Sequence, residues 1–223
     1  MYFYPMQKIY FLIWALLLAT TSESQVLGLL KYDGGGDWYA NPTALKNLTN
    51  FCIDELEMPV ALHESEVEPM DLDKSAISFL HATGHGRIYF EPSEVNAIRN
   101  FLERGGFLHI DDNYGMAEFA KAELLKIFPN QTPQQLPTEH PIFSGPFSFP
   151  DGLPKIHEHD NAPPSALGYF IEDELVCVLT IETDLGDGWE DPEVHNDQQE
   201  VRENALKMGA NLVHWALTRN SQP

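Results

Sequence analysis

The sequence predicts an α/β fold of three layers, with a mostly parallel sheet covered by helices on both faces. Apolar runs and segments of helical periodicity alternate from residue 25 to 128, which is the pattern of strand, helix and strand repeated. The first run, QVLGLLKY, is apolar throughout rather than alternating, as a central parallel strand requires because both of its faces are buried.

Residues 25–32 are the first expected strand, and the glycines at 34–36 end it. A helix follows from about Thr43, because apolar residues recur at helical spacing until Pro59. Residues 60–64 form a short second strand in this interpretation. A third strand begins at Ile77 and ends in the glycine-bearing turn HATGHG.

The next helix has the clearest boundaries, with Pro92 in its first turn and Gly105 beyond its end. It leads into an apolar strand at Phe107–Ile110. A further helix runs to Ile127 and stops at Pro129, and either Asp112 or Asn113 is its expected cap.

Residues 129–165 are rich in proline, yet they carry apolar side chains that need burial, so we expect a long ordered excursion. These side chains are Phe143, Phe147, Phe149 and Ile156. LGYFI and ELVCVLTI form an expected hairpin added to the C-terminal side of the sheet, turning at 172–174. After an acidic loop, a closing helix carries Val201 to Trp215 on its apolar face.

Residues 1–24 have the pattern of a secretory signal, with Lys8 ahead of the apolar run IYFLIWALLLA and small residues at Ser22 and Ser24. The run is too short to cross a bilayer comfortably, and an uncleaved anchor is the minority alternative. We therefore expect an exported protein, periplasmic or extracellular, with a single domain at 25–219 and no membrane span after cleavage.

The formal net charge is −21, which argues against binding to nucleic acid or to anionic membranes. Half of the residues in 182–193 are acidic, so this window could also collect cations. Cys52 and Cys177 are the two cysteines. Two separate buried thiols are the favoured interpretation, with a disulfide as the alternative in an exported protein.

The chemically unusual residues follow the first strand, the third strand and the strand at Phe107–Ile110. Ligands of doubly wound sheets bind at these carboxyl ends. His85 stands between two glycines and is a catalytic candidate, whereas His81 and His109 lie within strands and are expected to pack. The ligand-binding candidates are Asp33, Gly34, Gly35, Gly36, Asp37, Trp38, Asp112, Asn113, Tyr114 and Trp189. The alternative for the glycines is a tight turn without a ligand.

Asp111 is the main catalytic candidate. Adjacent carboxylates at a buried strand end repel one another, so at least one of Asp111 and Asp112 needs a hydrogen bond, a proton or a metal. If Asp112 caps the next helix, Asp111 remains free to act as a nucleophile, base or metal ligand.

Two later segments are dense in metal-ligating side chains. They supply His157, His159, Asp160, Asp184, Asp187, Glu190, Asp191 and His195 as candidate ligands of a divalent cation. Neither the zinc-protease motif H-E-x-x-H nor the EF-hand spacing is present. A solvated acidic loop is the alternative, and Trp189 among the acids argues against it. The chain also lacks a G-x-S-x-G elbow, a Walker loop and a G-x-G-x-x-G fingerprint.

The blocks KYDGGGDWYANPTAL, HATGHG, GGFLHIDDNYG, EHPIF, GLPKIHEHD and ETDLGDGWEDPEVHND closely resemble a bacterial family of domains of unknown function, number 4159. The resemblance implies a class I glutamine amidotransferase-like fold, flavodoxin-like in layout, and implies no reaction. In amidotransferase-like proteins a nucleophilic cysteine follows the corresponding strand at a tight elbow. Asp111 stands there instead, so this chain is not expected to be a cysteine-dependent glutamine amidotransferase.

Two functional hypotheses follow. The first is an exported carboxylate- or metal-dependent hydrolase of a polar small molecule or glycan, with Asp111 and His85 in the site. The second is a non-catalytic ligand-binding or assembly module on the same scaffold, with Trp38, Tyr39, Tyr114 and Trp189 forming a recognition surface.

Overall fold

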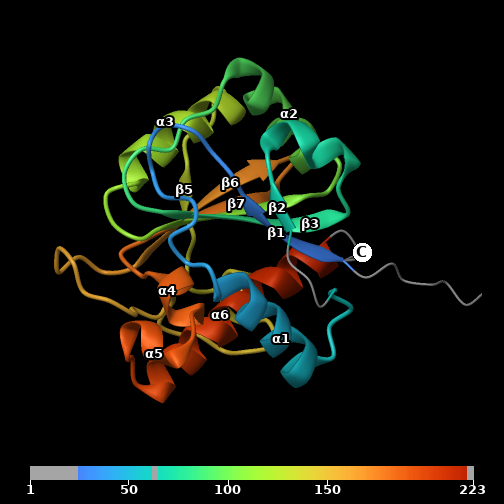
Figure 1. Ribbon diagram of the computed structural model, residues 1–223. Coiled ribbons are helices and arrows are strands. Elements are labelled where there is room, and N and C mark those ends of the chain that lie inside the picture. The colour runs from blue at the N-terminus through green and yellow to red at the C-terminus, as the bar shows by residue number, and fades with distance from the viewer. Residues whose placement is uncertain (1–24, 62–64, 220–223) are drawn as a thin grey trace, which may run out of the picture.

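The computed structural model describes residues 25–61 and 65–219, and its centre is a seven-stranded sheet with helices on both faces (Figure 1). The strand order is β2-β1-β3-β4-β7-β6-β5. Five neighbouring strands are parallel, and β6 and β5 extend the sheet in antiparallel fashion beyond β7. The strands are β1 Val26–Leu30, β2 Ser65–Val67, β3 Ile77–Gly84, β4 Phe107–Asp112, β5 Gln134–Gln135, β6 Ser165–Ile171 and β7 Glu174–Ile181.

The helices divide between the two faces, as Figure 1 shows. One face packs against α2 (Pro92–Glu103), α3 (Ala117–Ile127) and the 3-10 helix η1 (Pro69–Lys74). The other face packs against α1 (Ala44–Leu56), α4 (Leu185–Trp189), α6 (Gln199–Thr218) and η2 (Pro141–Phe143). The short helix α5 (Pro192–His195) lies beside α4. The prediction of an α/β sheet with helices on both faces is confirmed.

Several boundaries differ from the prediction. The second strand of the structure is Ser65–Val67. Of the strand predicted at 60–64, residues 62–64 lie outside the described residues, and Val60 makes an isolated bridge to Gln25. The acidic segment folds into α4 and α5, and β5 and η1 were not predicted. Most important for the site, β4 continues through Asp111 and Asp112, because Thr83 of β3 pairs with Asp111 on one side and Thr180 of β7 pairs with it on the other.

The proline-rich excursion is ordered and buries its apolar side chains against α1 and α6, as predicted. Cys52 and Cys177 are both buried free thiols, which confirms the favoured interpretation. The expected signal at 1–24 lies outside the described residues. Among the described helices, none combines the length and apolar character needed to cross a membrane.

Candidate functional site

The polar residues singled out in the sequence gather where the parallel strands end. β1 and β3 are neighbours although β2 lies on the outer side of β1, so the direction of strand order reverses between them. Such a reversal point is where open α/β sheets bind ligands. The loops after β1, β3, β4 and β7 all reach this edge, and the segment at 154–160 joins them from the excursion through the Ile156 amide, which donates to Thr183 O at 2.9 Å.

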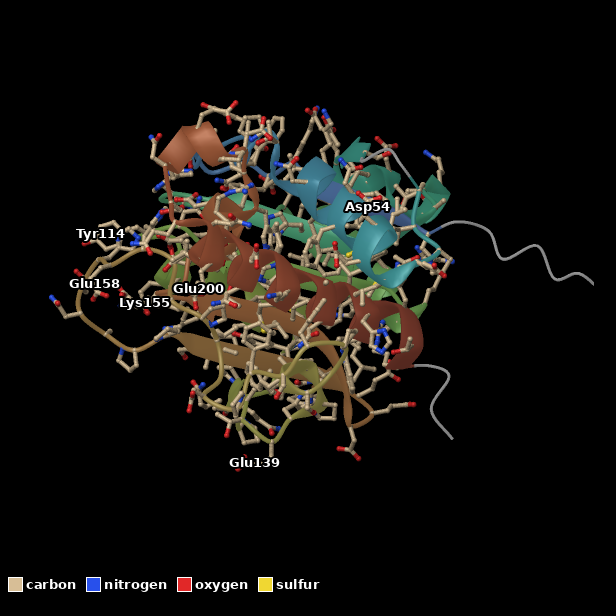
Figure 2. All side chains as sticks on the ribbon, turned by 90° about the horizontal axis from the view of Figure 1, so that it is seen from below. Asp54, Tyr114, Glu139, Lys155, Glu158 and Glu200 are labelled. Carbon is tan, nitrogen blue, oxygen red and sulfur yellow. The ribbon has the colours of Figure 1, made fainter. Side chains whose placement is uncertain are left out.

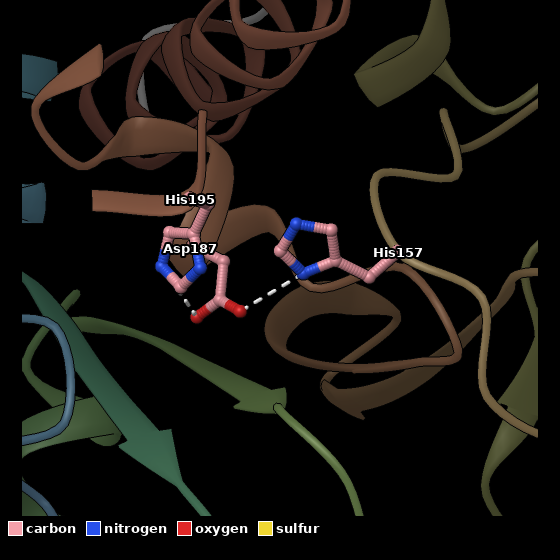
Figure 3. A group of neighbouring side chains, drawn as sticks. All are labelled: His157, Asp187 and His195. Carbon is pink, nitrogen blue, oxygen red and sulfur yellow. Dashed lines mark ion pairs between the residues drawn. The ribbon is translucent and has the colours of Figure 1, made fainter. Parts of the chain in front are cut away.

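His157, Asp187 and His195 form a group of potential metal ligands, with one ligand atom of each within 4.8 Å of the others. His157 Nδ1 lies 3.0 Å from Asp187 Oδ2, and His195 Nε2 lies 3.8 Å from Asp187 Oδ1. Figure 3 shows the two imidazole rings on either side of the carboxylate. Two imidazoles and one carboxylate are a donor set suited to a divalent transition metal.

Asp184 and His159 extend this group. Asp184 Oδ2 lies 2.6 Å from His159 Nε2 and 3.3 Å from His157 Nδ1. The Asp184 side chain is fully buried, and among the described residues its Oδ1 has no hydrogen-bond partner. A buried carboxylate oxygen without a donor is costly, and a cation between Asp184 and the histidines would satisfy it.

The acidic segment folds at this place because small residues allow α4 to pack closely. A Cβ on Gly188 would lie 2.4 Å from the Ala205 side chain on α6, so glycine is needed for this contact. Trp189 is fully buried beneath the site, and its indole N–H donates to Ala205 O at 2.8 Å. This tryptophan anchors α4 to α6, so Asp184 and Asp187 stand on a firmly packed turn.

Asparagine side chains hold Asp187, one of the candidate ligands. Asn41 Nδ2 donates to Asp187 Oδ1 at 2.6 Å, and Asn113 Nδ2 donates to the same oxygen at 2.9 Å. Thr83 completes this group, because its hydroxyl lies 2.7 Å from Asn41 Oδ1 and 2.9 Å from Asn113 Oδ1. Such partners of a ligand orient it and raise metal affinity. They leave Asp187 Oδ2 facing His157.

The ionisation of the cluster follows from these contacts. Hydrogen bonds to Asp184 and Asp187 raise the pKa of His157 to about 10. Burial raises the pKa of Asp187, but bonds from His157 and Asn41 outweigh it and hold the pKa below its usual range. The proton on His157 Nδ1 points toward Asp184 and Asp187, where a metal ion would bind, and metal binding would displace it.

Asp111 does not occupy an elbow. It is fully buried inside β4, Thr180 Oγ1 donates to its Oδ1 at 2.5 Å, and the Gly186 amide donates to its Oδ2 at 2.6 Å. Burial raises its pKa to about 7 despite these two bonds. The comparison with the amidotransferase elbow is therefore corrected: the strand extends two residues past Ile110, and the Asp111 carboxylate contacts α4 rather than open solvent.

The predicted cap is corrected, because α3 begins at Ala117 and Met116 is its N-cap. Asp112 holds the turn before the helix instead: its Oδ1 accepts from the Met116 amide at 2.7 Å and from the Tyr114 amide at 3.2 Å. Asn113 belongs to the group that holds Asp187. Tyr114 is exposed, stacks on the His159 ring with centroids 4.6 Å apart, and donates its hydroxyl to Asp160 at 3.2 Å. Figure 2 shows Tyr114 on the same side of the molecule as Lys155 and Glu158 of the neighbouring loop.

The glycine loop and His85 form a separate cluster at the same edge. Asp37 accepts from the His85 amide at 2.5 Å and lies 3.1 Å from its Nδ1, and both side chains are well exposed. Gly34 and Gly36 pack against the backbone of Arg87, and Asp33 pairs with Tyr89. These contacts support the alternative in which the glycines only permit a tight turn.

The predicted recognition surface of four aromatic residues is not assembled. Trp38 is half-buried with Lys31 Nζ 5.0 Å from its ring centre, and Tyr39 packs edge-on against it. Trp189 was predicted to bind ligand, but it is fully buried and cannot reach one. Two other metal candidates have further partners. Asp191 accepts from Asn47, and Glu190 accepts from Thr43 through Oε1 while its Oε2 lies 3.2 Å from His195 Nε2, closer than Asp187 does.

Sequence reasoning missed Asn41, Thr83 and Thr180, which support the cluster. Asparagine and threonine are common in turns and strands, so their type carries little signal. The only available hint was position, because Thr83 and Thr180 each end an apolar strand next to predicted site residues.

The comparisons with known proteins identify a family but no activity. A family model described as "Domain of unknown function (DUF4159)" matches residues 26–217, which is nearly the whole described chain. No curated protein matches the sequence.

Proposed function

The chain belongs to the DUF4159 family, and from the geometry of its histidine–carboxylate cluster we propose that it is a metal-dependent hydrolase. His157, Asp187 and His195 would hold one divalent transition metal ion, and Asp184 with His159 would border it. The observation that carries this proposal is the convergence of three ligand atoms within 4.8 Å next to a buried carboxylate oxygen that has no partner among the described residues.

The donor set favours a transition metal over calcium or magnesium. Calcium and magnesium sites are built from oxygen ligands, whereas two of the three atoms here are imidazole nitrogens. Three protein ligands leave a coordination position open, which is characteristic of catalytic rather than structural zinc sites. A bound metal ion of this kind lowers the pKa of its water to about 7 and so supplies a nucleophile at neutral pH.

The surroundings favour a neutral or cationic substrate, such as a polar small molecule or glycan. Lys155, in the same segment as His157 and His159, is held by Glu158 at 3.0 Å and Glu182 at 3.1 Å, and Arg202 donates to Glu190 O. These cations are engaged, and the chain carries a net charge of −21. An anionic substrate would meet repulsion at this edge.

We also propose the finer fold and the location that the sequence suggested. The parallel strands follow the order 2-1-3-4-7, which agrees with the flavodoxin-like order if β7 stands as the fifth strand. This supports a class I glutamine amidotransferase-like scaffold without its cysteine. Export to the periplasm or extracellular space rests on the signal pattern at 1–24.

Metal analysis tests the proposal first. The protein, stripped with a chelator and dialysed, is titrated with Zn²⁺, Mn²⁺ and Co²⁺ and then assayed against esters, amides and glycosides. We expect binding of one ion with loss of binding in His195→Gln, and metal-dependent cleavage of one substrate class. The matched control is His85→Gln, which replaces an imidazole outside the cluster. Equal metal binding by the two variants contradicts the site. A ligand that binds and is recovered intact contradicts the hydrolase and favours the binding module.

A further inference from the structure

Three side chains on neighbouring strands connect the protein core to Asp111. His81 of β3, His109 of β4 and Thr180 of β7 are fully buried and lie on the sheet face that α6 and α4 cover. His81 pairs with His109 in the strand register, and Asp111 pairs with Thr180. None of these groups is exposed to a substrate, so their polar chemistry needs another explanation.

The polar atoms form one continuous chain. His81 Nδ1 lies 3.1 Å from His109 Nδ1, and His109 Nε2 lies 3.0 Å from Thr180 Oγ1. Thr180 Oγ1 then donates to Asp111 Oδ1 at 2.5 Å. The chain ends on the opposite oxygen of the same carboxylate, which accepts the amide hydrogen of Gly186 at 2.6 Å.

The direction of the chain can be assigned from its donors. The direction follows for the ionised Asp111 carboxylate. The single hydrogen of the Thr180 hydroxyl then goes to Asp111, with Ile110 O further away at 3.3 Å, so His109 Nε2 is the donor to Thr180. His109 Nδ1 is then an acceptor and takes the hydrogen of His81 Nδ1. This leaves His81 Nε2 as a bare lone pair, and it is a nitrogen with no partner among the described residues. In this assignment the one orphan atom of the chain is an unpaired acceptor rather than an unpaired donor.

Gly186 is the point at which this chain meets the group that holds Asp187. A Cβ at Gly186 would lie 3.2 Å from Asp111 Oδ2, 3.2 Å from Thr83 Oγ1 and 3.1 Å from Asn41 Oδ1. Gly186 also stands between Asp184 and Asp187 in the sequence, at the start of α4. A shift of its amide would displace both carboxylates.

We propose that His81, His109, Thr180 and Asp111 form a positioning chain whose bond to the Gly186 amide sets the place of α4 and of the carboxylates Asp184 and Asp187. This inference rests on the proposed function, because it deepens the account of the same metal site. None of the four residues is among the proposed metal ligands. Asp111 is a positioning residue rather than a nucleophile, and it acts through α4.

The experiment compares Thr180→Val, which removes the hydroxyl at nearly constant volume, with Thr180→Ser, which keeps it. Ile98→Val is the matched control, because it removes one methyl group from the core on the opposite face of the sheet. Three quantities are measured in each protein. They are the hydrogen-exchange rate of the Gly186 amide by NMR, the affinity for Zn²⁺ by competition with a chelator, and the visible spectrum of the Co²⁺ form.

We expect Thr180→Val to weaken Zn²⁺ binding by roughly 10- to 100-fold, the usual effect of removing a group that orients ligands. The same variant should speed exchange of the Gly186 amide, and the visible spectrum of its Co²⁺ form should change because the ligands are displaced. Thr180→Ser should restore all three properties. Ile98→Val should leave them at wild-type values even though it lowers overall stability. If Thr180→Val does not fold, Asp111→Asn is measured instead, with the same expectation.

The outcomes separate this inference from the proposed function. If the wild-type protein binds the metal and Thr180→Val binds it with the same affinity as Ile98→Val, the positioning chain is overturned and the proposed metal site is not affected. Faster Gly186 exchange without any change in affinity also overturns it, because the chain then holds α4 without placing the ligands. A wild-type protein that binds none of the metals overturns the proposed function. If, in addition, the Gly186 amide exchanges at the same rate in Thr180→Val as in the wild-type protein, the positioning chain is overturned as well.

Discussion

Two clusters of imidazole and carboxylate groups lie at the carboxyl edge of the sheet, and they differ in how firmly the surrounding residues hold them. Asp37 and His85 pair with each other, and the side chains are 36% and 52% exposed. Asp184 and Asp187 lie on a helical turn that is anchored by a buried tryptophan, two asparagines and a chain of buried polar groups.

Residue type alone does not distinguish these clusters. An exposed ion pair contributes little, because water solvates its charges equally well when it breaks. A carboxylate whose backbone and hydrogen-bond partners are already fixed loses little entropy when it binds a metal, so it is suited to be a metal ligand. The difference in support therefore explains why we place the metal at α4 rather than at the glycine loop.

The largest expected effect comes from removing a ligand. His157→Ala should weaken Zn²⁺ binding by more than roughly 100-fold, because one of three ligand atoms is gone. Loss of a residue that only hydrogen-bonds to a ligand costs at most about that much. His85→Ala should leave the affinity unchanged. Chelator competition measures both values. Similar losses in the two variants would remove the distinction between the clusters.

Glycine substitutions compare the packing of the two regions. Gly186→Ala introduces a methyl group 3.1 Å from Asn41 Oδ1, and we expect overpacking to cost up to about 3 kcal/mol of unfolding free energy. Gly35→Ala meets no atom within 4 Å but has φ +91°, so a cost of about 1 kcal/mol is expected from backbone strain alone. Urea unfolding gives both numbers. A cost at Gly35 larger than at Gly186 would contradict the closer packing around α4.

The buried histidines predict a pH effect on stability. Burial lowers the pKa of His81 to about 3, so the folded state stays neutral while the unfolded chain takes up a proton below its usual pKa of about 6.5. Stability from His81 is therefore present above that pH and lost as the pH falls. Between pH 6.5 and 5 the loss amounts to about 2 kcal/mol.

The variant His81→Gln isolates this contribution from the other titrating groups. Between pH 6.5 and 5 its unfolding free energy should fall less than that of the wild-type protein. The two decreases should differ by about 2 kcal/mol, the contribution of His81. Phe79→Leu serves as a destabilised control from the same core without a titrating group. Parallel pH curves for wild-type and His81→Gln would show that the imidazole is not buried in neutral form.

The smallest effect concerns the exposed pair. Asp37→Asn should change the unfolding free energy by less than about 1 kcal/mol, because exposed ion pairs are worth little and the amide oxygen can still accept from the His85 backbone. Zn²⁺ affinity should not change. Thermal unfolding with and without the metal checks both expectations, and a loss of metal stabilisation would place Asp37 in the site.

The sequence predicted the framework well where periodicity and boundary residues agree. α2 begins at Pro92 as predicted and ends just before the predicted glycines, and β3 begins at Ile77. β4 was predicted too short, because Asp111 and Asp112 read as polar residues after a strand. In the structure the pairing of Asp111 with neighbours on both sides keeps the strand going.

The ligand candidates were predicted by type, but their arrangement was not. Eight metal candidates came from two segments. Tertiary structure gathers His157, Asp187 and His195, with Glu190 beside His195, while Asp191 binds Asn47 of α1. α4 has one turn and two glycines, so no periodicity reveals it. His81 and His109 were correctly placed in the core, yet their link to Asp111 depends on strand register, which the sequence does not specify.

The order of the ligands along the chain has a consequence for biosynthesis. The supports Asn41, Thr83, Asp111 and Asn113 all precede the proposed ligands, which extend from His157 to His195. During translation these four residues emerge from the ribosome before any proposed ligand does. A growing chain therefore has no complete set of the proposed ligands until His195 of α5 has been made, and the ion can bind the full proposed site only after that point.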